Sequence, residues 1–185
     1  MLGGGAEPGI PDSGGFRVRA PSVRGQLRFW WRATAGARRY ETVEALREAE
    51  AIFWGSTAGP GKVRIRQEIV DEGRNLTAGE RQALPNPNYP LFPIYPDRRA
   101  SVIHEQVVRL WIRLDTSAAT RMAEANDVVR TLSAWLMFGG VGGRWRRGLG
   151  SVELLGPTPF LQQPGAHGDL EEVTRIGTDN DGHFL

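Results

Sequence analysis

The sequence predicts an α+β protein of the ferredoxin-like (RRM-like) class, a βαββαβ unit whose first strand is missing or truncated. Two observations predict this class. Apolar residues recur with helical spacing in two stretches, and between these lie two stretches in which apolar and polar residues alternate, as in strands. A glycine-rich loop and a short strand follow, which gives the order helix, strand, strand, helix, strand. Many unrelated proteins use this arrangement, so the fold class alone does not decide the function.

Length and composition indicate one folded domain. The 185 residues, 40% of them hydrophobic, are enough to bury a core. We expect a domain over residues 1–155 and a tail or linker over residues 156–185. No run approaches the roughly 20 apolar residues that a membrane span needs, so we expect no membrane partner. The lack of cysteine excludes disulfides and thiolate zinc sites, and it fits a cytoplasmic location.

The first elements are a loop, a short strand and a helix. Residues 1–15 are rich in Gly and Pro and predict a loop, and "FRVRA" (16–20) alternates as a short strand does. Pro21 and Ser22 then predict the start of a helix, with Ser22 as its N-cap. One side of this helix carries Val23, Leu27, Trp30 and Thr34.

A long proline-rich loop divides the remaining elements. The stretch 75–99 is too dense in proline for regular structure. The other predicted elements are a helix (41–53), a strand (62–70), a second strand (103–115), a helix that ends at a glycine pair (117–140) and a short strand (150–155).

Arginine is concentrated in two segments that contain no acidic residue. Residues 16–40 contain seven arginines, and residues 138–152 contain three. A GC-rich genome favours arginine overall, but it does not separate charge along a chain. The separation therefore predicts a basic surface for a polyanion.

Three of these arginines form a stripe on the first predicted helix. Arg24, Arg28 and Arg32 recur every four residues, which places them along one side of the helix. Three like charges at this spacing repel one another unless an anion neutralises them. We expect that anion to be RNA phosphate; the alternative is that Arg28 or Arg32 pairs with a glutamate of the second helix, at position 44, 48 or 50.

The second basic segment is a glycine loop, "GGVGGRWRRGLGS" (139–151). It does not match the dinucleotide fingerprint or the P-loop pattern. Its glycines permit positive φ and close approach of a backbone, and three arginines supply charge at the same place. We expect a contact with a phosphate backbone, and the alternative is a simple connection from helix to strand. The residues concerned are Gly140, Gly142, Arg144, Arg146, Arg147, Gly148 and Gly150.

These segments resemble a known family. The glycine loop resembles the C-terminal glycine signature of the RAMP superfamily of CRISPR systems. More narrowly, "RAPSVRGQLRFWWRA" (19–33) and "EAEAIFWGS" (48–56) resemble the N-terminal part of the first-numbered subunits of Cmr (type III-B) effector complexes. The resemblance implies a ferredoxin-like, non-nuclease subunit of an antiviral ribonucleoprotein. Its implied partners are guide (CRISPR) RNA, target RNA and other Cmr subunits, with no small-molecule substrate.

The family motifs point to particular RNA-binding positions. By position in these motifs, the resemblance assigns Ser22, Arg24, Gly25, Arg28 and Arg32 to the first helix, and Gly140, Gly142, Arg144, Arg147, Gly148 and Gly150 to the loop. Family members have a strand before a glycine pair near the start, whereas this chain opens with "MLGGG". We therefore expect the sheet to lack one edge strand.

Catalysis is the less favoured alternative. Some RAMP proteins cut RNA by metal-independent chemistry with a histidine, so the runner-up is an endoribonuclease that processes CRISPR RNA. Of His104, His167 and His183, only His104 lies in a predicted element, and no acidic cluster has metal-ligand spacing. We expect no enzyme activity, no metal and no cofactor. A purely structural assembly subunit is the third possibility.

The tryptophans divide into two groups. We expect Trp30, Trp31, Trp111 and Trp135 to belong to the core, because they lie in predicted helices and strands. Trp145 is the exception, since it lies between arginines in the glycine loop and is free to stack on a base. We further expect the loop and the Ser22 end of the first helix to form one continuous basic site.

Overall fold

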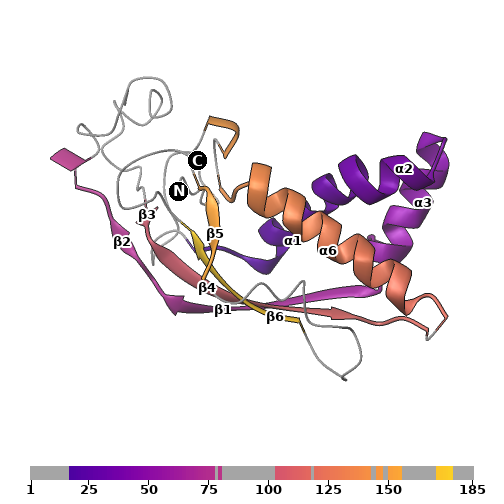
Figure 1. Ribbon diagram of the computed structural model, residues 1–185. Coiled ribbons are helices and arrows are strands. Elements are labelled where there is room, and N and C mark those ends of the chain that lie inside the picture. The colour runs from indigo at the N-terminus through magenta and orange to yellow at the C-terminus, as the bar shows by residue number, and fades with distance from the viewer. Residues whose placement is uncertain are drawn as a thin grey trace.

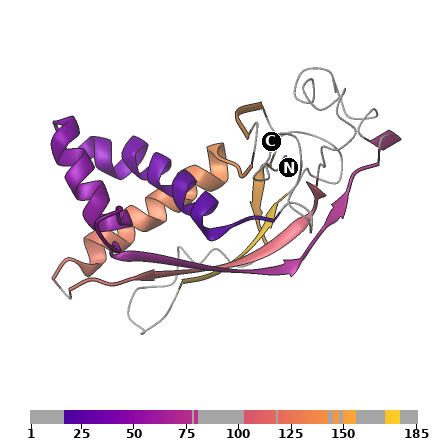
Figure 2. The same ribbon diagram turned by 180° about the vertical axis from the view of Figure 1, so that it is seen from behind.

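A computed structural model describes residues 17–77, 79–80, 103–117, 119–142, 145–147, 150–155 and 170–176; for Arg147 and residues 170–176 it describes the backbone alone. The fold is α+β, and its helices lie on one face of a four-stranded antiparallel sheet (Figures 1 and 2). This arrangement is compatible with the predicted ferredoxin-like class. Among the described residues, no helix is both long and apolar enough to cross a lipid bilayer.

The elements follow the predicted order, with several additions. They are α1 (Ala20–Trp31), η1 (Arg32–Gly36), α2 (Ala37–Arg39), α3 (Val43–Trp54), β1 (Val63–Asp71), β2 (Arg74–Asn75), β3 (Ile103–His104), β4 (Gln106–Leu114), α6 (Arg121–Phe138), η2 (Trp145–Arg147), β5 (Val152–Leu154) and β6 (Leu170–Ile176). The predicted loops at 1–15 and over most of 75–99 lie outside the described residues.

Helix α1 begins three residues earlier than an N-cap at Ser22 predicts. Arg19, not Ser22, is the N-cap residue, and the backbone N–H of Ser22 already donates to the Arg19 carbonyl at 2.9 Å. The buried residues of α1 are Val23, Leu27 and Trp31. The side of α1 that faces the core therefore carries Trp31 and not the predicted Trp30. The prediction of Ser22 as N-cap was wrong because Pro21 is tolerated inside the first turn, where its missing N–H costs nothing.

The segment before α1 is not the predicted strand. Val18 is completely buried, but side chains rather than a neighbouring strand hold its backbone. Its N–H donates to the Gln106 Oε1 atom at 3.1 Å, and its carbonyl accepts from the Gln67 side-chain amide. The buried Gln106 side chain also donates to the Glu72 carbonyl at 3.3 Å. Strands β1 and β4 therefore fix where α1 starts.

A π-helical turn, η1, joins α1 to α2 in one continuous helical run. No pattern in the sequence predicted this wider turn, in which the Ala37 N–H donates to the Arg32 carbonyl. Gly36 lies at its end, and a Cβ atom there would be 2.6 Å from the Leu46 Cδ1 atom of α3. The lack of a side chain at position 36 thus leaves room for Leu46, and a larger residue there would have to displace the end of that side chain.

Helix α3 and the strands β1 and β4 confirm the predictions for residues 41–53, 62–70 and 103–115. The Thr42 hydroxyl caps α3 by accepting from the Ala45 N–H at 3.2 Å. Strands β1 and β4 pair antiparallel, with Ile65 opposite Ile112. The predicted second strand is interrupted at Glu105, whose φ of 56° separates β3 from β4.

Helix α6 lies across the sheet beside α1, as Figures 1 and 2 show from both sides. Its buried residues Val128, Leu132 and Trp135 recur with helical spacing, which confirms the helix predicted over 117–140. Together with the buried residues of α1 and β4, they form one core between the helices and the sheet.

Residues 156–185, predicted as a tail or linker, supply one strand of the sheet. Strand β6 lies between β4 and β5 and is antiparallel to both. In a ferredoxin-like unit the first strand lies between the third and fourth strands, so β6 takes the place and direction of that strand. The expectation that the sheet lacks an edge strand was therefore wrong, because the first strand has an inner position and β6 occupies it. Strand β6 was not predicted because "LEEVTRI" does not alternate between apolar and polar residues.

Candidate nucleic-acid interface

Two arginines of the predicted stripe share one buried carboxylate. The Arg28 Nε and Arg32 Nη1 atoms lie 2.6 and 2.7 Å from the same Glu50 Oε1 atom, and the Glu50 side chain is only 5% exposed. The alternative of pairing with the second helix is therefore confirmed for Glu50. Burial disfavours the Glu50 carboxylate, but the hydrogen bonds from Arg28 and then Arg32 outweigh it and lower the pKa of Glu50.

This Arg28–Glu50–Arg32 cluster retains positive charge toward the solvent. Two guanidinium groups and one carboxylate leave a net charge of +1, and the Arg28 and Arg32 side chains are 34% and 43% exposed. Each guanidinium has five N–H donors, so several stay available after the contacts with Glu50 and the Gly55 carbonyl. The cluster is thus both a link between α1 and α3 and an exposed basic surface.

The third arginine of the stripe has no such partner. Arg24 lies one turn before Arg28, and it makes no ion pair with the described part of the chain. Its Nε atom is buried without a hydrogen-bond partner among the described residues, although the side chain is partly exposed.

Gly25 lies on the exposed side of α1. A Cβ atom at this position would meet nothing within 4 Å, so the described part of the chain gives no packing reason for glycine there. Glycine inside a helix costs about 1 kcal/mol relative to alanine. Arg28 and Phe29 are its neighbours one turn later, so the bare backbone at Gly25 borders the basic cluster.

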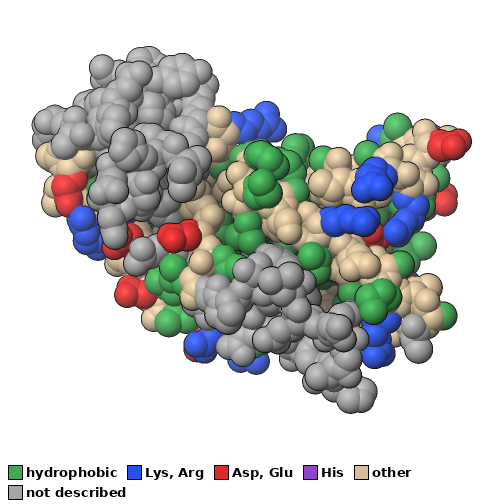
Figure 3. Space-filling model, in the orientation of Figure 1, with side chains coloured by type: hydrophobic (Ala, Val, Ile, Leu, Met, Phe, Trp, Pro, Cys, Tyr) green, Lys and Arg blue, Asp and Glu red, His purple; other side chains and the backbone are tan. Residues whose placement is uncertain are grey.

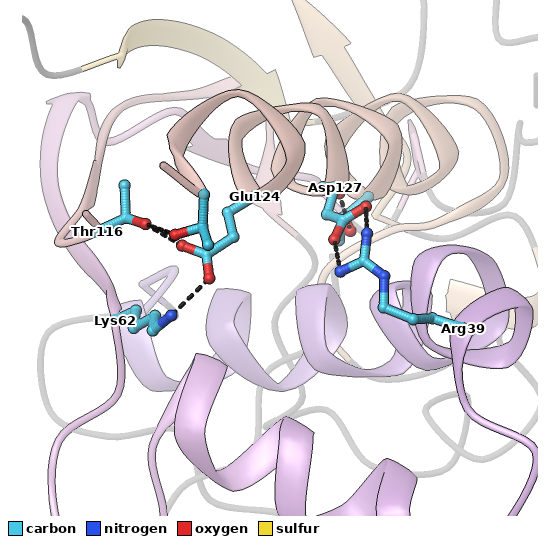
Figure 4. A network of polar contacts seen from close by, with 7 residues as sticks. Arg39, Lys62, Thr116, Glu124 and Asp127 are labelled. Carbon is cyan, nitrogen blue, oxygen red and sulfur yellow. Dashed lines mark hydrogen bonds and ion pairs between the residues drawn. The ribbon is translucent and has the colours of Figure 1, made fainter. Parts of the chain in front are cut away.

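A second set of ion pairs fastens α6 to its neighbours. Arg39 of α2 holds the buried Asp127 carboxylate by two contacts of 2.6 and 3.1 Å, and Lys62 contacts Glu124 one turn earlier on α6 (Figure 4). Burial raises the pKa of Glu124, but hydrogen bonds from Lys62 and Thr116 outweigh this effect and lower it. Figure 3 shows basic side chains gathered on this side of the helices.

The ends of the glycine loop close on each other. The Val141 N–H donates to the Gly150 carbonyl at 2.8 Å, and a Cβ atom on Gly150, whose φ is 75°, would lie 1.9 Å from the Val141 carbonyl oxygen. Gly140 is similarly crowded by the Gly150 carbonyl, at 2.8 Å from its Cβ position. Gly140 and Gly150 are therefore required by the fold of the loop. Gly142 has a φ of 91°.

Aromatic contacts place the loop beside α1. The Trp145 ring lies 6.0 Å from the Phe29 ring and 6.4 Å from the Trp30 ring, measured between centroids. The Arg146 Cζ atom lies 5.4 Å from the Trp145 centroid. The contact is with the second half of α1 and not with Ser22, which lies about 10 Å earlier along the helix axis. Arg144, Gly148 and the Arg147 side chain are outside the described residues.

Comparisons with known proteins decide the family. The sequence model of the RAMP superfamily matches residues 1–153. The chain belongs to the RAMP superfamily.

Two proteins similar to this chain are subunits of a CRISPR Cmr system. The CRISPR system Cmr subunit Cmr1-1 of Pyrococcus furiosus is 30% identical over 141 residues, which are 75% of this chain and 40% of that protein. Subunit Cmr1-2 of the same organism is 42% identical over 50 residues, 27% of each chain. The crystal structure of Cmr1 from P. furiosus (apo form) superposes with a TM-score of 0.57 and 27% identity, over 72% of this chain and 40% of that one. The chain thus spans about two fifths of the Cmr1 proteins that it resembles.

One tryptophan of this RAMP chain, Trp111, lies on the opposite face of the sheet from the core in which we expected it. Trp31 and Trp135 are buried as predicted, and Trp30 packs against the core from its edge. Trp111 lies between Leu110 and Ile112, which are both buried, so its own side chain points to the opposite face of β4. There the Arg66 Cζ atom lies 4.8 Å from its ring and the Arg109 Cζ atom 5.9 Å.

The described histidine, His104, lies beside an acidic side chain. The His104 Nε2 atom lies 3.5 Å from the Glu105 Oε1 atom, at the break between β3 and β4. No group of three or more His, Cys, Asp or Glu suited to a metal ion occurs within the described ranges. His167 and His183 lie outside them.

Proposed function

We propose that this RAMP protein is a non-catalytic RNA-binding subunit of a type III-B CRISPR (Cmr) ribonucleoprotein. The membership of the family and the similarity to Cmr1 support the complex, and the exposed side of α1 supports the RNA contact. The observation that carries the proposal is the Arg28–Glu50–Arg32 cluster, which keeps positive charge in the solvent beside the bare backbone of Gly25.

The proposed ligand is the backbone of guide or target RNA. A guanidinium group presents parallel N–H donors that match the oxygens of a phosphate. Gly25 lets that backbone approach the helix without a side chain between, and Arg24 adds charge one turn earlier. Because phosphates carry no sequence information, this surface binds with little sequence preference. The other Cmr subunits are the proposed protein partners in the cell interior.

The salt dependence of RNA binding tests the phosphate contact. We compare Arg28→Gln/Arg32→Gln/Glu50→Gln with the matched variant Arg64→Gln/Arg113→Gln/Asp115→Asn. The latter removes a similar cluster on β1 and β4, in which Asp115 lies 2.7 and 2.9 Å from its two arginines. Each variant removes two positive charges and one negative charge, so the total charge changes equally.

Affinity for single-stranded RNA is measured at several salt concentrations with the full chain. The α1 variant should bind more weakly, and its log–log salt slope should fall by about 0.7 for each phosphate that it no longer binds. The sheet variant should keep the wild-type slope. Equal slopes in all three proteins, or an equal decrease of affinity in both variants, would contradict a specific RNA surface on α1.

Co-purification tests the assembly. The full chain, expressed with the other subunits of a type III-B complex and its guide RNA, should be recovered in one particle. If the α1 variant fails to enter the particle yet binds RNA normally when purified alone, the surface serves protein assembly and the purely structural alternative holds.

A further inference from the structure

Four aromatic side chains from three separate segments meet at one end of the helical layer. Phe29 and Trp30 come from α1, Phe138 from the last turn of α6, and Trp145 from the glycine loop. Their ring centroids lie 5.2 Å apart for Phe29 and Trp30, 6.0 Å for Phe29 and Trp145, and 6.1 Å for Trp30 and Phe138. We call these four residues the aromatic cluster.

The aromatic cluster is buried on its inner side and exposed on its outer side. Trp30 packs against the core, whereas Phe29 is 38% exposed and Phe138 is 65% exposed. Met137, beside Phe138, is 72% exposed. Figure 3 shows hydrophobic side chains gathered over the end of α6 near the glycine loop, with basic side chains next to them. A grouped exposed apolar surface of this kind indicates a binding surface.

The charge around the aromatic cluster favours a nucleotide as its ligand. Arg146 lies over the Trp145 ring, and the two segments 16–40 and 138–152, which supply all four rings, contain no acidic residue. Aromatic rings beside arginines, without carboxylates, suit a ligand that joins a flat base to a phosphate. Helix α6 ends at Phe138, where its last carbonyl groups favour base amino groups over phosphate.

We propose that Phe29, Phe138 and Trp145 form a stacking surface for an unpaired base of single-stranded RNA, with its phosphate against Arg146. This inference rests on the proposed RNA-binding function and adds a contact of a different kind. The Arg28–Glu50–Arg32 cluster holds the backbone, and the aromatic cluster holds a base. Single strands are therefore preferred to duplexes, in which every base is already stacked.

Affinity for two RNA probes of equal charge tests the inference. The probes are a 12-residue oligoadenylate and the same oligomer with abasic sites in place of most bases. The wild-type chain should bind the oligoadenylate about tenfold more tightly than the abasic probe. Trp145→Leu should abolish most of this preference and keep the wild-type salt slope, because the phosphate contacts remain.

Two further variants keep the test decisive. Phe138→Ser alters a largely exposed residue, so it should fold normally and also reduce the preference for bases. Trp111→Leu is the matched control, since it removes a tryptophan with nearby arginines from the opposite side of the sheet. Thermal unfolding of each variant establishes that it is folded.

The outcomes separate the two proposals. Equal affinity of the wild-type chain for both probes would overturn base stacking and leave backbone binding intact. Failure of the wild-type chain to bind either probe would overturn RNA binding, and base stacking with it. If Phe138→Ser and Trp145→Leu bind both probes as the wild-type chain does but no longer assemble with other Cmr subunits, the aromatic cluster is a protein interface and the inference is wrong.

Discussion

The guanidinium group of Arg28 lies 2.6 Å from the carboxylate of Glu50, and this carboxylate is almost completely removed from water. Arg32 contacts the same oxygen atom from the next turn of the helical run. A buried carboxylate with two arginine partners is stable only as long as the partners remain, since an isolated buried charge is costly. The same two side chains therefore hold α1 on α3 and are available, under the proposed function, to bind RNA.

Removal of both arginines should destabilise the fold. Arg28→Gln/Arg32→Gln leaves Glu50 buried without a cation, and we expect the free energy of unfolding to fall by about 2 kcal/mol, less than for a fully buried pair because the arginines are partly exposed. Adding Glu50→Gln should restore most of this stability. Urea unfolding of the wild-type chain and the two variants measures both effects. If the double variant were as stable as the wild-type chain, the ion pairs of Arg28 and Arg32 with Glu50 would have no structural role.

The ion pairs of Glu50 and Glu124 should make stability fall at acidic pH. Both groups have pKa values below their ordinary 4.5, so each stabilises the folded state above that pH. The stabilisation should decline from about pH 4.5 downward, as the pH falls through the lowered pKa of the folded protein. Urea unfolding at successive pH values measures this decline. Glu50→Gln should make it shallower, and an unchanged decline would show that Glu50 does not contribute.

Gly25 and Gly150 should respond in opposite ways to alanine. Gly25→Ala meets open space and removes a flexible residue from a helix, so stability should rise by up to about 1 kcal/mol while RNA affinity falls. Gly150→Ala would drive its Cβ into the Val141 carbonyl, so stability should fall. Thermal unfolding measures the stability of both variants, and RNA titration measures their affinity for RNA. A Gly25→Ala protein with normal RNA affinity would exclude close backbone approach at this position.

Deletion of residues 156–185 should destabilise the sheet. Strand β6 pairs with β4 along Gln106–Ile112 and also with β5, so its removal exposes two strand edges in the middle of the sheet. Unpaired edges bind other strands, and we expect a lower unfolding temperature together with self-association. Calorimetry and size-exclusion chromatography test this expectation. A monomeric truncated protein of unchanged stability would mean that β6 adds nothing to the fold.

The isolated chain should not cut RNA. We expect no cleavage of CRISPR repeat RNA with or without divalent metal, and we expect His104→Ala to behave as the wild-type chain does. Gel analysis of labelled RNA after prolonged incubation is the measurement. Reproducible cutting that His104→Ala abolishes would establish the endoribonuclease alternative.

Local patterns in the sequence were sufficient to predict most of the elements. The helical spacing of Val128, Leu132 and Trp135 and the alternation within β1 and β4 are properties of neighbouring residues, and both sets of elements are present. The start of α1 was misplaced because Gln106 fixes Val18 from across the fold. Strand β6 was missed because its residues do not alternate, so pairing with its neighbours on both sides makes it a strand.

The two acid-free basic segments and the motifs that join this chain to the RAMP superfamily can be identified from the order of the amino acids alone, because both are local runs of residues. Which partners these residues contact depends on the three-dimensional packing of the helices. Glu50 forms ion pairs with Arg28 and Arg32, and Trp145 packs against Phe29, because α1 lies between α3 and the end of α6. Contacts between residues distant in the sequence depend on how helices pack on a shared sheet, and no local pattern specifies that packing.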